Sequence, residues 1–233
     1  MNNMSKIGFI STMAGYATRV FEDPNGVNPS VIVAQAILES GWGTSELAKY
    51  NNFFGLNNYN DGYLVNAGTV VKKVPQEHNG KVTYNYEEMA YFENIEDCFK
   101  SLKKWYTRPH YIQNLKSAGN DSFKQIEAIK RSGYATSSQY VEAITRIIKE
   151  NNLLRYDTCY SVQCGAFHNK SIASNLKAIL NDKFNRNIFS LEYDGKMYYV
   201  RAFKSHDIEK IREWISANIT MLPLGSFARE VYR

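Results

Sequence analysis

Glu39 is the residue whose type and position point most directly to chemistry. The run from Ser30 to Ser40 is apolar almost throughout, which predicts a helix buried in a domain core. Glu39 lies near the C-terminal end of this helix, where Ala36 and Ile32 share its face. Burial and the negative end of the helix dipole both disfavour an ionised carboxylate, so we expect a raised pKa. A glycosidase needs such a protonated acid to donate to the leaving sugar oxygen; the alternative is a solvated Glu39 pointing outward at the helix end.

A second carboxylate is expected on a β-hairpin. Apolar and polar residues alternate within 69–92, and Asn79-Gly80 is a strong signal for a tight hairpin turn. Glu77 stands just before this turn. Glu87 and Glu88 are its rivals, because alternation does not fix which carboxylate points into a cleft.

The Gly41-Trp42-Gly43 triplet follows the buried helix. The two glycines would let a polymer approach the backbone closely, and Trp42 offers an aromatic face for stacking. The chain is rich in aromatic residues, with 12 Phe, 17 Tyr and 3 Trp, as sugar-binding proteins often are.

The elements that must position these residues form two groups, which predicts an α+β protein of two domains, 1–157 and 158–233. The first group reads as helices with the one hairpin; its expected helices are 9–20, 30–40, 95–106, one opened by a Ser122-to-Gln125 capping box, and one capped by Ser137/Ser138. The second group reads strand, helix, strand, strand, helix, strand, which is the order of a ferredoxin-like βαββαβ sandwich. Its expected elements are 160–167, 170–181, 188–193, 197–203, 207–218 and about 222–232.

The first group resembles the endo-β-N-acetylglucosaminidases of glycoside hydrolase family 73. The motifs that carry the likeness are Asn28 to Ser45, Phe53-Phe54-Gly55-Leu56-Asn57, Gly133-Tyr134-Ala135-Thr136 with Tyr140, and Leu154-Arg155-Tyr156-Asp157. The resemblance implies a lysozyme-like fold that hydrolyses the β-1,4 bond between N-acetylglucosamine and N-acetylmuramic acid in peptidoglycan.

The same resemblance assigns roles to individual residues. It places Glu39 at the general acid, Glu77 near the second carboxylate, and Tyr134 in the cleft, where it would orient the acetamido group or the reacting sugar. Trp42 and Phe54 are then expected to contact the substrate.

Two positions depart from the family pattern. Ser137 stands where an Asp is expected, and Met89-Ala90 replaces the usual Phe-Arg pair, which removes a guanidinium. The mechanism stays open between a base that activates water, giving inversion, and attack by the substrate's own acetamido oxygen.

The second group resembles SPOR domains, which bind peptidoglycan glycan strands stripped of their peptides. Tyr160 to Phe167 matches the opening strand and Tyr198 to Arg201 a later one, whereas Ala202-Phe203-Lys204 departs from the usual Gly-Pro-Phe. Gln163, Tyr199 and Arg201 are the expected ligand contacts. The alternative is that these residues show only the alternation of polar and apolar positions found in any half-buried strand.

Composition narrows the partners. The net charge is +5, and residues 158–233 hold 11 Lys and Arg against 7 Asp and Glu, which suits an anionic wall polymer. Without a dense basic cluster, nucleic acid is not expected as a partner. No apolar run reaches the roughly 20 residues of a membrane helix, so no membrane insertion is expected either.

Three cysteines and four scattered histidines predict no disulfide framework, no metal site and no cofactor. The opening residues do not read as a secretory signal, so we expect synthesis in the cytoplasm and action on the bacterial cell wall after release.

These observations leave several hypotheses. The first is a wall-degrading glucosaminidase with a wall-binding domain; for its role we expect first a phage endolysin that lyses the host, and next a bacterial autolysin. The second is a muramidase or lytic transglycosylase of lysozyme-like fold. The third is a peptidoglycan-binding protein whose catalytic domain is inactive, against which the intact Glu39 argues. The oligomeric state is not specified by the sequence.

Overall fold

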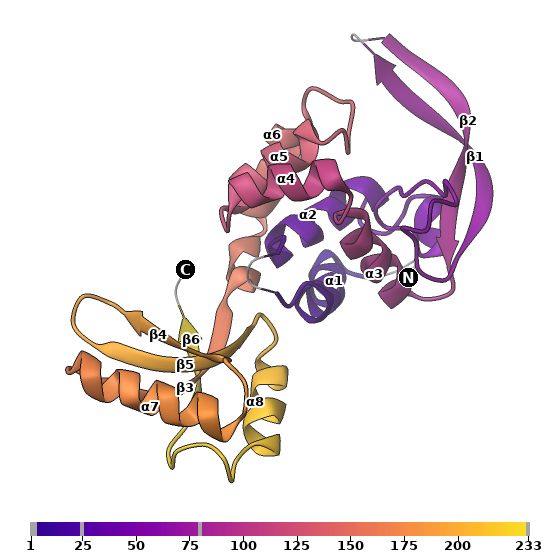
Figure 1. Cartoon of the computed structure of the whole chain (residues 1–233). Helices are drawn as coiled ribbons and strands as arrows, with labels where there is room; N and C mark the ends of the chain where they lie inside the picture. Colours follow the sequence, from indigo (N-terminus) through magenta and orange to yellow (C-terminus); the bar gives the residue numbers. More distant parts are fainter. Residues whose placement is uncertain (1–3, 24–25, 79–80, 232–233) are drawn as a thin grey trace. The chain divides into compact units, whose positions relative to one another are not determined.

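The chain forms two compact units, Met1–Asp157 and Thr158–Arg233, each with its own hydrophobic core. The computed structural model describes residues 4–23, 26–78 and 81–231, and at 74–78 and 81–82 it describes the backbone alone. Helices dominate the first unit and a four-stranded sheet the second (Figure 1), in agreement with the expected α+β class.

Helix α2, Pro29–Ser40, is the centre of the first unit. All residues from Pro29 to Ile37 are buried. Proline at the first turn suits the start of a helix because its missing N–H needs no partner there. Gly41 ends the helix in the left-handed conformation (φ 55°), and its N–H reaches the carbonyl of Ile37.

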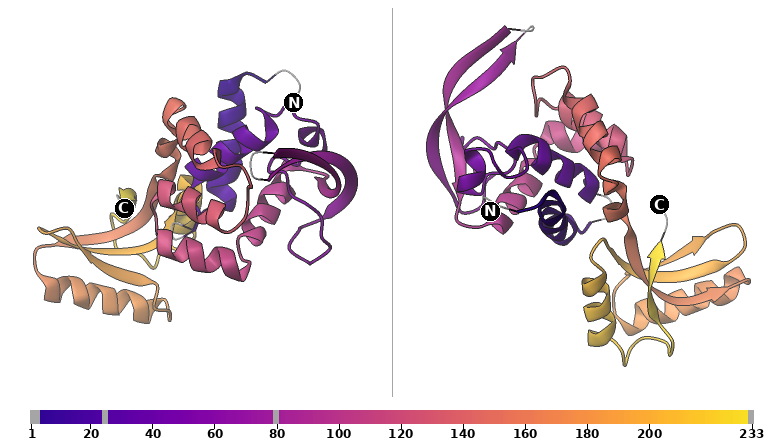
Figure 2. Two further views of the ribbon diagram at one scale, coloured as in Figure 1. Left: turned by 90° about the horizontal axis from the view of Figure 1, so that it is seen from above. Right: turned by 180° about the vertical axis from the view of Figure 1, so that it is seen from behind.

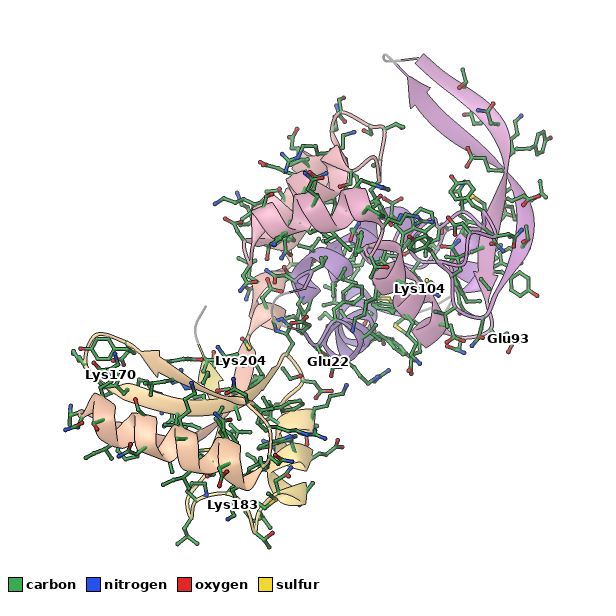
Figure 3. All side chains as sticks on the ribbon, in the orientation of Figure 1. Glu22, Glu93, Lys104, Lys170, Lys183 and Lys204 are labelled. Carbon is green, nitrogen blue, oxygen red and sulfur yellow. The ribbon has the colours of Figure 1, made fainter. Side chains whose placement is uncertain are left out.

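The other elements of the first unit surround α2 or extend from it. The side chains between α1, α2 and α3 fill the space between these helices, whereas Lys104 on α3 and Glu93 lie at the surface (Figure 3). The elements are α1 Lys6–Val20, η1 Leu47–Tyr50, β1 Ala67–His78, β2 Lys81–Phe92, α3 Ile95–Trp105, α4 Pro109–Ala118, α5 Ser122–Arg131, α6 Tyr140–Glu150 and η2 Leu153–Asp157.

Strands β1 and β2 form the expected antiparallel hairpin. Their pairing runs from Ala67 opposite Phe92 to His78 opposite Lys81. The hairpin extends away from the helices (Figure 1). The expected turn at Asn79-Gly80 lies outside the described residues.

Two expected features of the helices were wrong. The N-cap of α5 is Asp121, whose carboxylate accepts from the backbone N–H groups of Phe123 and Lys124, and Ser122 is the first helical residue. Helix α4 was not expected, although Pro109 at its first turn and the spacing of Tyr111, Leu115 and Ala118 fit a helix. No Ser137/Ser138 cap is formed, since α6 begins after Gln139 and no side chain caps it.

The N-terminal end of α2 is fixed by Asp157. Its carboxylate accepts hydrogen bonds from the backbone N–H of Ser30 (2.7 Å), the Ser30 hydroxyl (2.6 Å) and the Ser122 hydroxyl (2.8 Å). A carboxylate at this end satisfies an N–H group that has no partner within the helix and complements the positive end of the dipole. The last residue of the first unit therefore holds its central helix in place.

Replacing Asp157 by Ala should destabilise the first unit. The substitution leaves buried donors of Ser30 and Ser122 without their acceptor, so we expect the free energy of unfolding to fall by about 2–3 kcal/mol. Urea denaturation of the full chain at neutral pH measures the change. The control Glu127→Gln removes an exposed carboxylate from α5 and should change stability by less than about 0.5 kcal/mol; equal midpoints for the two variants would contradict the assignment.

The second unit is the expected βαββαβ sandwich. The sheet order is β4-β5-β3-β6 with every pair antiparallel, and α7 and α8 lie against the same face of the sheet (Figure 2). The elements are β3 Cys159–Phe167, α7 Lys170–Lys183, β4 Phe189–Tyr193, β5 Tyr198–Ser205, α8 Ile208–Ala217 and β6 Phe227–Val231.

In the described part of the chain, none of the helices has the length and apolar character needed to cross a membrane.

Candidate active site

Glu39 occupies the last turn of α2 and is half-buried. Burial raises the pKa of its carboxyl from 4.5 to about 7. The loop after η1 passes close to it: a Cβ added to Gly55 would lie 3.7 Å from Glu39 Oε2. Because Gly55 also has φ of +62°, any larger residue there would strain the backbone beside this carboxyl. With this pKa the carboxyl group is largely protonated below about pH 6 and about half protonated near pH 7.

Buried tyrosine hydroxyls lie near the Glu39 carboxyl. Burial raises the pKa of Tyr106, Tyr134 and Tyr140 well above the usual value, and the charge of Glu39 adds to each shift. All three hydroxyls thus keep their protons and can donate hydrogen bonds.

Gln35 links two of these tyrosines from inside α2, one helical turn before Glu39. The Tyr106 hydroxyl donates to Gln35 Oε1 (2.7 Å), and Gln35 Nε2 donates to the Tyr140 hydroxyl oxygen (2.8 Å). Gln35 is fully buried, so this network fixes the packing around the site. Gln35 was not among the predicted site residues, although a polar residue inside an apolar helix is a signal that points to it.

Tyr134 holds the loop that runs past Glu39. Its hydroxyl donates to the carbonyl of Phe54 (2.7 Å), the residue before Gly55. The ring of Phe54 is only 1% exposed and packs edge-on against Phe99, with centroids 5.0 Å apart. The expected substrate contact of the Phe54 side chain was therefore wrong: the ring belongs to the core, and the residue serves the site through its backbone.

The same loop is fastened along β2. Asn52 Nδ2 donates to the carbonyls of Leu56 (2.9 Å) and Ala90 (2.8 Å), and the Ala90 N–H donates to Leu56 (2.8 Å). The Asn58 N–H donates to the Glu88 carbonyl (2.8 Å). The loop thus runs beside the edge of the hairpin, and the fully buried Ala90 packs where the family pattern has a guanidinium.

Of the two rival carboxylates whose side chains the structure describes, that of Glu87 contacts this loop. Asn57 Nδ2 donates to Glu87 Oε2, and Asn57 lies two residues after Gly55. Glu88 is exposed.

Glu77 lies further along the hairpin. Its backbone pairs with Val82, five residues beyond the pair of Lys72 and Glu87, or about 17 Å along the strand. The preference for Glu77 is therefore not supported by its backbone position, and its side chain lies outside the described part of the chain. Alternation along a strand gives the face of a residue and not its distance from the helices.

Trp42 packs against α1. Its ring meets Phe9 edge-on at 6.1 Å between centroids, and Lys6 Nζ lies 4.7 Å from its ring centroid. Trp42 is half-buried, so its expected role as a stacking face competes with these contacts.

The raised pKa of Glu39 should make stability depend on pH. The unfolded chain releases this proton near pH 4.5 and the folded chain near pH 7, so ionisation opposes folding as pH rises through this interval. Glu39→Gln removes the ionisation. We expect the variant to match the wild-type pH dependence below pH 4 and to gain up to about 3 kcal/mol relative to wild type by pH 8.

Chemical denaturation at a series of pH values measures this difference, with Glu127→Gln as the control that should show no such trend. A constant difference between Glu39→Gln and wild type from pH 4 to pH 8 would contradict burial as the cause of the shift.

In the second unit the structure brings Gln163, Tyr199 and Arg201 together. Arg201 lies opposite Gln163 in the sheet, with Nη2 3.3 Å from Gln163 Oε1, and its guanidinium carbon lies 4.4 Å from the Tyr199 ring centroid. Tyr199 and Arg201 line a pocket of about 490 Å³. Gln163 is buried and does not line this pocket, so its expected contact with a ligand stays a prediction.

Charged residues that the sequence analysis did not name complete this pocket. Arg201 Nη1 forms an ion pair with Glu192 (2.6 Å), and Asp194 accepts from the Tyr199 hydroxyl (2.7 Å). This hydrogen bond and two from backbone N–H groups lower the pKa of Asp194 to about 2. Arg229 also lines the pocket, which therefore presents both signs of charge.

A mainly helical domain with one hairpin and a protonated glutamic acid at the end of its buried helix defines a lysozyme-like glycoside hydrolase. Sequence comparison agrees: residues 16–153 match the family described as mannosyl-glycoprotein endo-beta-N-acetylglucosaminidase, and residues 157–216 match the SPOR domain. The chain belongs to this glucosaminidase family, and a SPOR domain follows its catalytic domain.

Solved structures support the fold. The peptidoglycan hydrolase of Sphingomonas sp. A1, in mutant form, is similar with a TM-score of 0.54 and 21% identity over 65% of this chain and 97% of that one. The catalytic domain of the autolysin Auto from Listeria monocytogenes is similar with a TM-score of 0.53 and 23% identity, over 65% of this chain and 86% of that one.

Curated relatives carry different names. The chain is 33% identical over 155 residues to the exo-glucosaminidase LytG of Bacillus subtilis, covering 64% of this chain and 52% of that protein. It is 34% identical over 163 residues to a probable N-acetylmuramidase of Lactococcus lactis, covering 66% of this chain and 36% of that protein. The chain thus spans about half or less of the length of these relatives.

Proposed function

We propose that this chain hydrolyses the β-1,4 bond between N-acetylglucosamine and N-acetylmuramic acid in peptidoglycan, with Glu39 as the general acid. The observation that carries the proposal is the pKa of about 7, which leaves a large share of the Glu39 carboxyls protonated near neutral pH, where an ordinary glutamate is ionised. The protonated carboxyl donates to the glycosidic oxygen as the bond to the anomeric carbon breaks. The hydroxyls of Tyr106 and Tyr134 already donate to Gln35 and to the Phe54 carbonyl, so Tyr140, whose hydroxyl accepts from Gln35, is our candidate donor to the carboxylate that remains.

Glu87 is our candidate for the second carboxylate. The loop from Gly55 to Asn57 joins the two groups, since Gly55 adjoins Glu39 and Asn57 holds Glu87. In an inverting reaction Glu87 takes a proton from the attacking water on the far side of the sugar. In a substrate-assisted reaction the acetamido oxygen attacks instead, and the second carboxylate matters less.

Glu39→Gln should abolish wall lysis while the chain stays folded. An amide cannot donate the catalytic proton, so we expect a loss of about 10²- to 10⁴-fold in kcat. For wild type, kcat/KM should fall as pH rises above about 7, because the acid is then ionised in the free enzyme. Turbidity loss of purified peptidoglycan measures both effects, with Glu127→Gln as the active control; near wild-type lysis by Glu39→Gln would remove the proposal.

The three hairpin carboxylates can be ranked by the same assay. We expect Glu87→Gln to lower kcat by about 10²-fold or more under an inverting mechanism, and Glu88→Gln and Glu77→Gln to lower it by less than about 3-fold. The ranking follows from the contact of Glu87 with Asn57. A loss confined to Glu77→Gln would restore the preference taken from the family, and the absence of any loss would favour assistance by the substrate.

A muramidase is the second candidate, because one relative is named a probable N-acetylmuramidase. Mass spectrometry of the released ends separates the possibilities: a reducing N-acetylglucosamine supports our proposal, a reducing muramic acid a muramidase, and an anhydro-muramic acid a lytic transglycosylase. Zymography excludes or supports the third possibility, a binding protein without activity.

We propose further that the second unit binds peptide-free glycan strands through the pocket of Tyr199 and Arg201. Its excess of Lys and Arg suits an anionic wall and would raise the local concentration of substrate at the first unit. Action at the cell wall fits a phage endolysin, our first expectation, and also a bacterial autolysin, the name of one relative in Enterococcus faecalis. Dependence of host lysis on a separate membrane lesion would favour the endolysin.

A further inference from the structure

A pocket lies beside the candidate active site, between the loop from Gly55 to Asn58 and the hairpin of β1 and β2. It has a volume of about 420 Å³ and is lined by Asn57, Asn58, Tyr59, Glu87 and Glu88. This volume falls within the range of small-molecule sites. Tyr59 is 63% exposed, so the pocket offers a large aromatic side chain that the fold does not cover.

The ring of Tyr59 is held in place from behind. It packs on Trp105 with ring centroids 6.0 Å apart, and the Arg108 guanidinium carbon lies 3.4 Å from the Trp105 ring centroid. Arg108 is in turn fixed by Tyr63, 4.3 Å from its ring centroid, and by an ion pair with Asp61 (2.6 Å). An aromatic ring supported in this way loses little entropy when a ligand stacks on it.

The polar groups of the pocket are chiefly hydrogen-bond acceptors. The carboxylates of Glu87 and Glu88 accept only, and Asn57 donates its amide N–H to Glu87 while its oxygen remains an acceptor. The Glu87 charge also acts on the Tyr59 hydroxyl, whose pKa is raised by burial and by this carboxylate. Such a set suits the hydroxyl and amide protons of a neutral sugar and repels an anionic one.

The pocket is tied to Glu39 by three residues of chain. Gly55 adjoins the Glu39 carboxyl, and Asn57 and Asn58 line the pocket. When one sugar of a glycan lies at Glu39, a neighbouring sugar of the same strand can therefore reach this pocket.

We propose that this pocket is a sugar subsite that takes a neutral N-acetylated hexose, stacked on Tyr59, and disfavours a sugar bearing a free carboxylate. The inference rests on the proposed function. Peptidoglycan strands alternate N-acetylglucosamine with N-acetylmuramic acid, whose lactyl group carries a carboxylate once the peptide is removed. A subsite that selects the neutral sugar sets the register of the strand and hence which of the two bonds lies at Glu39.

Tyr59→Ala tests the stacking. We expect KM for soluble peptide-free glycan fragments to rise roughly 5- to 10-fold with kcat nearly unchanged, because the lost contact is made equally in the ground and transition states. Tyr59→Phe keeps the ring and should stay within about 2-fold of wild type. The control Tyr86→Ala removes a 77% exposed tyrosine of β2 that does not line the pocket and should leave KM unchanged.

Glu88→Lys tests the selection by charge. We expect the ratio of kcat/KM for peptide-free peptidoglycan strands to that for chitin oligosaccharides, which carry no carboxylates, to rise several-fold over wild type. Calorimetry with chitin hexaose on the Glu39→Gln chain repeats the Tyr59 comparison without turnover and should show a roughly 5- to 10-fold weaker Kd for Tyr59→Ala.

Unchanged KM and Kd in Tyr59→Ala would overturn the subsite, and an unchanged ratio in Glu88→Lys would overturn its selectivity for a neutral sugar. Neither result affects the role of Glu39, whereas lysis by Glu39→Gln would refute the proposed function and leave the calorimetric comparison valid.

Discussion

The free-energy cost of ionising a carboxyl group in a buried setting is the constraint on which this protein depends. Glu39 ends a helix whose other residues are almost all buried, and it lies where the dipole of that helix is negative. Water is the best stabiliser of a carboxylate, and the packing around α2 removes much of it. The proton stays on the carboxyl because the surrounding protein makes releasing it expensive.

This constraint holds only while α2 is kept rigid at both ends. Asp157 accepts a hydrogen bond from the backbone N–H of Ser30 in the first turn of α2, and Gly41 ends the helix after its last turn. Between them, Gln35 ties α2 to Tyr106 and Tyr140. A glycosidase gains little from an acid whose position drifts, since proton donation requires hydrogen-bond distance to the glycosidic oxygen.

The loop after η1 links the acid to the rest of the proposed cleft. Tyr134 holds it at Phe54, Asn52 binds it to β2, and Asn57 contacts Glu87. One segment thus lies between Glu39, Glu87 and the pocket of Tyr59, and sets the separation of the two carboxylates proposed for catalysis. The second unit adds a different pocket, in which Arg201 and Glu192 neutralise each other and acidic residues outnumber the arginines. The selectivity of this pocket therefore depends on shape and hydrogen bonding, whereas the excess of Lys and Arg belongs to the unit as a whole.

From the sequence we could predict the two units, the buried helix with Glu39 near its end, the hairpin and the βαββαβ sandwich, but not α4. These follow from local periodicity and from turn and cap residues, which act over a few positions of chain. Tertiary structure alone decided that Phe54 is core, that Gln163 is buried, that Glu87 meets the loop whereas Glu77 lies far along the hairpin, and that Tyr59 rests on Trp105. These contacts join residues tens of positions apart, and packing between elements sets them, which no local pattern encodes.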